Sequence, residues 1–158
     1  MKEIPFDDFE GLRAEIREEF GDFGQEVEIS QHMIQTFADL TGDQQWIHVD
    51  VERAQAESPF GGPIAHGFLT LSMLPSVRPG NTFSVTGFGN ATNYGSDGLR
   101  FLSPVPSGST IHARARLCDV KGKKHGTLLT TEIAVHVKGD DRPGLLYKSL
   151  ILYTPRRS

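Results

Sequence analysis

Two side chains that exchange protons, an aspartate and a histidine, lie close together in the first third of the chain. Asp43 and His48 occur in the run TGDQQWIH over residues 41–48. A loop that begins at a glycine can fold back, so that a carboxylate and an imidazole meet at one water molecule and act on it as acid and base. The same residues also have a structural interpretation, in which Asp43 caps a helix and His48 bonds a local carbonyl. Spacing alone favours the structural interpretation, because both residue types are common in loops.

The elements on either side of this pair are two predicted helices. Ser30 is a typical N-cap for a helix that ends at Gly42. Residues 43–49 are then expected to form a loop, and Asp50 is expected to cap a short helix that ends at about Ala56. The apolar face of the first helix consists of Met33, Ile34, Phe37, Ala38 and Leu40.

A third predicted helix, over residues 66–77, is apolar around most of its circumference. A helix of that kind is normally buried. Its large side chains include Phe68, Leu71, Met73 and Leu74, all of which are predicted to be mostly buried. At the N-terminus, Phe6, Phe9, Leu12, Ile16 and Phe20 have roughly helical spacing, which predicts a helical extension within residues 1–25.

The second half of the chain changes to the period of β-strands. Residues 111–117 and 129–137 alternate between apolar and other side chains, as half-buried strands do. Residues 145–153 are largely apolar and are predicted to form a third long strand. Weaker strands are predicted over 26–29, 82–88 and 99–102. Helices followed by antiparallel strands indicate an α+β fold, in which a curled sheet encloses the buried helix.

Several of these segments together resemble the MaoC-like family of (R)-specific enoyl-thioester hydratases. The resemblance starts in residues 37–50, continues through PIAHGF at 63–68 and NYG at 93–95, and includes RFLSPVPSG at 100–108. It covers most of the chain, from about Glu26 to Tyr153. It implies one hot-dog domain over residues 1–158, a homodimer joined sheet edge to sheet edge, and hydration of a trans-2-enoyl-CoA to a (3R)-hydroxyacyl-CoA.

The resemblance also implies roles for individual residues. Asp43 and His48 correspond to the acid/base pair, although the sequence does not say which is the acid. Gly67 corresponds to the residue whose backbone N–H holds the thioester oxygen, a role that suits a helix N-terminus. Trp46, His66, Asn93 and Tyr94 are the expected substrate contacts. Independently of the resemblance, Asn93 and Tyr94 also fit a turn at the end of a strand.

One departure leaves other functions open. Many hydratases of this family have Asn-Pro where this chain has Gln45-Trp46, and this version resembles a NodN-like branch. Thioester hydrolysis is therefore an alternative, as is a non-catalytic module that binds acyl thioesters. Retention of both Asp43 and His48 speaks against pure binding. The carrier is either coenzyme A or an acyl carrier protein.

Composition excludes several classes of protein. A chain of 158 residues fits one domain, and its formal net charge of -4 gives no general attraction to nucleic acid or anionic membranes. The N-terminus lacks a signal peptide and no long apolar run occurs, so we expect a cytoplasmic protein. Cys118 is the single cysteine, and the histidines lack metal-ligand spacing. We therefore expect no metal and no cofactor, with coenzyme A present only as part of the substrate.

Overall fold

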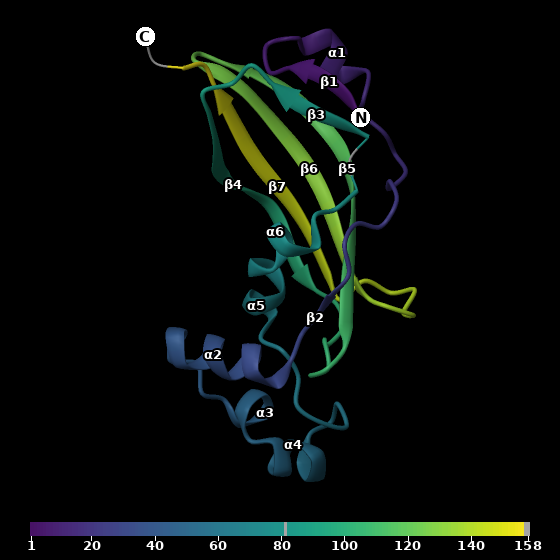
Figure 1. The fold of residues 1–158 in the computed structure, drawn as a ribbon, viewed down its shortest axis with the longest axis vertical. Helices are drawn as coiled ribbons and strands as arrows, with labels where there is room; N and C mark the ends of the chain where they lie inside the picture. The colour runs from purple at the N-terminus through teal and green to yellow at the C-terminus, as the bar shows by residue number, and fades with distance from the viewer. Residues whose placement is uncertain (81, 157–158) are drawn as a thin grey trace.

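The computed structural model describes residues 1–80 and 82–156, and its largest element there is a curved antiparallel sheet of five strands in the order β2-β5-β6-β7-β4 (Figure 1). The strands are β2 (Val27–Glu28), β4 (Asn90–Phe101), β5 (Thr110–Lys123), β6 (Gly126–Val137) and β7 (Leu145–Thr154). The predicted strands over 111–117, 129–137 and 145–153 are thus confirmed. The strand predicted over 99–102 is only the end of β4, which is much longer.

The alternation of buried and partly exposed side chains along β5 explains which face of the strand points into the core. Ile111, Ala113 and Ala115 are buried, whereas the intervening positions are partly exposed. Successive side chains of a strand point to opposite faces, so this pattern directs one face into the core. The strand then pairs with β6 from Ile111 opposite Val137 to Lys123 opposite Gly126.

The N-terminal segment differs from the predicted helical extension. Only α1 (Phe9–Arg13) is helical, and β1 (Lys2–Pro5) pairs in parallel with β3 (Phe83–Thr86). Further along, Gly21 and Gly24 donate their N–H groups to the carbonyls of Ala115 and Ala113 on β5. The predicted helical extension is therefore helical only over Phe9–Arg13, because the backbone after α1 hydrogen-bonds to the edge of the sheet instead of to itself.

The helices α2 (Gln31–Thr41) and α4 (Val51–Glu57) begin at the predicted caps, and α3 (Trp46–Val49) lies between them. The Ser30 hydroxyl accepts from the N–H of Met33, Gly42 ends α2 with φ +80°, and the Asp50 side chain accepts from the N–H of Arg53. Leu40 is 82% exposed, so its predicted place on the buried face of α2 was wrong. At 11 residues, α2 is the longest helix of the described residues, well short of the about 20 needed to span a membrane.

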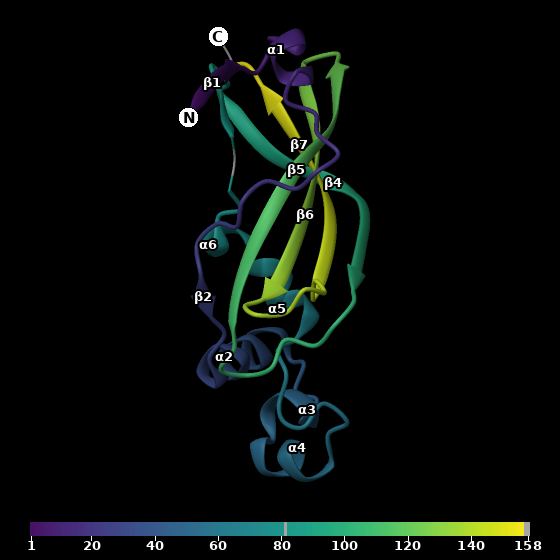
Figure 2. The same ribbon diagram turned by 90° about the vertical axis from the view of Figure 1, so that its right-hand side faces the viewer.

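The buried helix predicted over 66–77 is two short helices, α5 (Gly67–Ser72) and α6 (Leu74–Val77). Figure 2 shows α5 and α6 beside the middle of the sheet, with α2–α4 at one end and α1, β1 and β3 at the other. Leu69 and Val77 are buried in the core. Phe68, however, is 62% exposed, although its ring packs edge to face on Phe101 at the end of β4. The prediction that Phe68 is buried was therefore wrong for the single chain.

Candidate active site

Asp43 and His48 lie where α2 ends and α3 begins. Gly42 takes a left-handed conformation and its N–H bonds the carbonyl of Ala38, which stops α2 and turns the chain at Asp43. His48 lies in α3, so the loop predicted over residues 43–49 is helical from Trp46 onward. Gln31 Nε2 donates to the backbone carbonyl of His48 over 2.8 Å and ties α3 to the start of α2.

His48 is buried, and its hydrogen bonding fixes its tautomer. Nδ1 lies 2.7 Å from the carbonyl oxygen of Ile64. A carbonyl oxygen only accepts, so Nδ1 carries the hydrogen and Nε2 carries the lone pair. Burial lowers the pKa of His48 below its ordinary value, and a charge on His66 lowers it further, while the Ile64 bond and the Asp43 charge oppose this. His48 is therefore set up as a neutral base.

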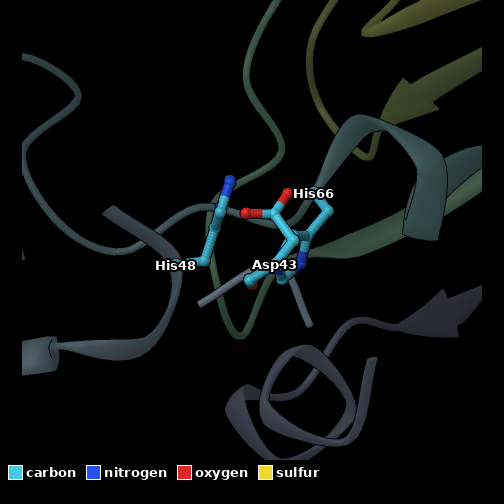
Figure 3. A group of neighbouring side chains, drawn as sticks. All are labelled: Asp43, His48 and His66. Atoms are coloured by element: carbon cyan, nitrogen blue, oxygen red, sulfur yellow. The ribbon is translucent and has the colours of Figure 1, made fainter. Parts of the chain in front are cut away.

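Asp43 and two histidines form one compact group. One carboxylate oxygen of Asp43 and one ring nitrogen each of His48 and His66 lie within 4.8 Å of one another. Figure 3 shows the Asp43 carboxylate beside the two imidazoles. This separation allows one water molecule to contact both Asp43 and His48. The structural interpretation of Asp43 as a helix cap is not supported, because the N-cap of α3 is Gln45 and no side chain caps that helix; Asp43 accepts only a long 3.4 Å bond from the Gln45 N–H.

His66 is the third member of the group and is almost fully buried. Its Nε2 lies 2.9 Å from the backbone carbonyl oxygen of Asp43. Its ring is stacked on that of His48, with centroids 3.9 Å apart and planes at 28°. The sequence predicted His66 as a substrate contact, but in the structure it bonds Asp43 and stacks on His48 instead of lining the neighbouring cavity.

A cavity of about 410 Å³ lies beside the pair. His48 and Gly67 both line it, and most of its other walls are apolar. The lining includes Phe60, Phe68, Phe101 and Val105. Asp43 is exposed and does not line the cavity, although its carboxylate is close to His48. An apolar cavity with a few polar groups at one place suits an acyl chain whose reactive end meets those groups.

Gly67 shows why this position requires a glycine. A Cβ placed there would come within 2.7 Å of the Phe101 ring, so the ring could not lie where it does. Gly67 is also the first residue of α5, and no protein acceptor for its N–H occurs within the described residues. The N–H is thus free to bind a ligand in the cavity.

Three predicted substrate contacts lie away from this cavity. Trp46 packs under the guanidinium of Arg53, 4.3 Å from its ring centroid. Asn93 and Tyr94 lie inside β4, next to a break in the register with β7, so the prediction of a strand-end turn was wrong. None of the three lines the cavity in the described chain.

Sequence reasoning missed several cavity residues. Phe101 and Val105 belong to the stretch RFLSPVPSG, which is part of the family resemblance but was not assigned a role in the site. Phe60 lies in the turn-rich segment before α5. Their apolar character was visible, but which way they face follows only from the fold.

Asp43, His48 and His66 are also residue types that bind metal ions, and they lie close enough together to be considered as a metal site. Metal binding needs one lone pair from each ring to converge on the ion. The Nε2 of His66 already bonds the Asp43 carbonyl, which leaves only its Nδ1, and the lone pairs of the two stacked rings lie in separate planes 28° apart. The arrangement therefore suits proton transfer better than metal binding.

Comparison with known proteins gives a consistent result. Residues 14–138 match the family described as MaoC like domain. The chain is 44% identical over 128 residues to 3-hydroxyacyl-thioester dehydratase Z of Mycobacterium tuberculosis, which covers 80% of this chain and 83% of that protein. It is 45% identical over 123 residues to nodulation protein N of Rhizobium meliloti, covering 75% of this chain and 74% of that protein.

A solved structure extends the likeness to the fold. The X-ray structure of a monoamine oxidase regulatory protein from Archaeoglobus fulgius matches with a TM-score of 0.72 and 27% identity, over 99% of this chain and 100% of that one. The hot-dog fold and the α+β class predicted from the sequence are thereby confirmed.

Proposed function

Because the chain belongs to the MaoC-like family, we propose that it is a hydro-lyase that reversibly hydrates a trans-2-enoyl thioester to a (3R)-hydroxyacyl thioester, with coenzyme A as the carrier. One observation supports the proposal: His48 and Gly67 line one apolar cavity, and the Asp43 carboxylate lies close to His48. The proposed reaction uses these protein groups and requires no cofactor.

The proposed reaction starts with a water molecule held between Asp43 and His48. In the direction of hydration, its oxygen attacks C3 of the alkene while His48 accepts one of its protons at Nε2. Negative charge moves to the thioester oxygen as an enolate, and the Gly67 N–H donates a hydrogen bond to it. The pair then delivers one proton to C2, so that one water is added and the enzyme ends as it began.

The test is an assay with crotonyl-CoA and longer enoyl-CoA thioesters that distinguishes three functions. Hydration removes the absorbance of the conjugated enone and leaves the thioester intact. Hydrolysis instead releases free thiol from saturated acyl-CoA as well. Tight binding without either change supports a non-catalytic module that binds acyl thioesters. This alternative is retained because the chain is also similar to nodulation protein N. Chiral analysis of the hydration product then tests for the (3R) alcohol.

The proposed enzyme is a homodimer joined through β4. This strand lies at the edge of the sheet, and eleven of its 12 residues are exposed. A long exposed edge strand offers unpaired backbone groups to another chain. Phe101 ends β4 and lines the cavity, while the exposed Phe68 packs on it edge to face at 5.7 Å. A partner chain on this edge would cover both rings and lie near the active site.

A further inference from the structure

The proposed mechanism gives no role to His66, although this residue contacts both members of the reacting pair. It is 3% exposed and immediately precedes Gly67. One face of its ring stacks on His48 at 3.9 Å, and the Phe37 ring lies 5.0 Å from it. The side chains packed around the ring therefore hold it in place.

Its hydrogen bond defines what it does to Asp43. Since the Asp43 carbonyl can only accept, Nε2 of His66 is the nitrogen that carries the hydrogen. Nδ1 is then a buried acceptor with no protein partner among the described residues. The Nε2–H of His66 is thus used to hold the backbone of Asp43.

Other bonds hold Asp43 less well. Its own N–H reaches the Thr41 hydroxyl at 3.4 Å, and its carboxylate receives the Gln45 N–H at the same distance. Both are at the limit of a hydrogen bond, whereas the bond from His66 is 2.9 Å long. The residue follows Gly42 in an exposed loop, so loss of the His66 bond would let the carboxylate move relative to His48.

We propose that His66 is a positioning residue that fixes the separation of Asp43 and His48 by bonding the backbone of one and stacking on the ring of the other. Its place directly before Gly67 also joins this pair to the start of α5, where the proposed oxyanion donor lies. The kinetic consequences rest on the proposed function, while the geometric claim can be tested without turnover.

The stack has a second consequence, which concerns the titration of His48. The ionisable groups that face His48 are Asp43 and His66. Positive charge on His66 disfavours a second charge on His48 and so helps to lower the pKa of His48. Removing the imidazole of His66 should therefore raise the midpoint at which His48 titrates.

The experiment compares His66→Gln with His66→Asn. Glutamine carries an amide N–H near the position of Nε2, so it can still reach the Asp43 carbonyl, whereas asparagine is too short. NMR of ¹⁵N-labelled histidine rings follows the titration of His48, and backbone amide shifts follow residues 43–45. We expect both variants to raise the His48 midpoint, and only His66→Asn to shift the loop amides. His32→Gln, at an exposed position of α2, is the matched control.

The kinetic arm uses the same proteins. His66→Gln should keep most of kcat, while His66→Asn should lose about 10²-fold in kcat, as a displacement of about 1 Å can cause, with KM little changed. An unaltered His48 midpoint together with unaltered loop amides in both variants would overturn the proposal. Equal loss in both variants, with a lowered thermal midpoint, would also overturn it and leave a purely structural role. If the wild type hydrates nothing, the proposed function fails, and the NMR arm still decides the inference.

Discussion

His48 Nδ1 lies 2.7 Å from the carbonyl oxygen of Ile64, and this bond joins α3 to the segment that leads into α5. The Ile64 N–H in turn bonds the carbonyl of Ile47, and the next N–H, of Ala65, bonds that of Val105. The acceptor is therefore held from both sides. The free nitrogen of His48 is oriented by the backbone, as catalytic imidazoles require.

The first prediction concerns the pH dependence of turnover. His48 must be neutral to accept a proton, and burial lowers its pKa below the ordinary 6.5. The acid limb of kcat/KM, which reports the free enzyme, should therefore have its midpoint below pH 6.5. Rates measured with crotonyl-CoA from pH 4.5 to pH 8, about the range that brackets an ordinary histidine, test this. A midpoint above the ordinary value would contradict the assignment.

Stability should also depend on pH in the range of histidine titration. Burial is the main cause that lowers the pKa values of His48, His112 and His136 below 6.5. The unfolded chain then binds more protons, so the stability that these residues confer is present above pH 6.5 and is lost as the pH falls through their folded pKa values.

Urea unfolding at a series of pH values measures this effect. The carboxyl groups of Glu15 and Asp119, whose pKa values are lowered from 4.5 and 3.8, lose their contribution only in a more acidic range. The two windows are thus separable. His136→Gln should flatten the dependence near pH 6, about where an ordinary histidine titrates. A free energy of unfolding that is constant or rises as the pH falls across this range would be inconsistent with the buried histidines.

How far the sequence could predict this molecule depends on whether a feature is local. Ser30, Gly42 and Asp50 define helix ends through bonds within a few residues, and the alternation in β5 directs its own face, so these predictions were correct. The bond from His66 to Asp43 joins residues 23 positions apart, and no spacing rule predicts it. Likewise, Phe68 is apolar at helical spacing, but its exposure depends on how the rest of the chain packs around α5.

A third prediction concerns Gly67 and the ring beside it. Gly67→Ala keeps the N–H but places a methyl group 2.7 Å from the Phe101 ring, which must then move in the cavity. We expect kcat/KM to fall by roughly 10–10²-fold. Adding Phe101→Leu should restore part of the loss, since the two residues are in contact and their effects are coupled. Phe101→Leu alone is the control, and failure of the double variant to recover would show that the contact is not the cause.

The fourth prediction concerns assembly at β4. Sedimentation equilibrium at micromolar concentration should give a mass of twice the 17.4 kDa of one chain. Tyr94→Lys places a charge on this exposed edge and should shift the protein toward monomer. Leu40→Lys, at a residue that is 82% exposed on α2, is the matched control and should leave the mass unchanged. A wild-type monomer would exclude the dimer.

The central claim is that Asp43 and His48 together carry out proton transfer to and from water. The most direct test is the rate of crotonyl-CoA hydration by Asp43→Asn and His48→Gln. The controls are Asp50→Asn, which still caps α4, and His32→Gln, at an exposed position of α2. Each change at the pair should cut kcat by at least about 10²-fold, with thermal midpoints nearly intact and both controls near wild type. Wild-type rates in both Asp43→Asn and His48→Gln, in an enzyme that does hydrate the thioester, would contradict the account.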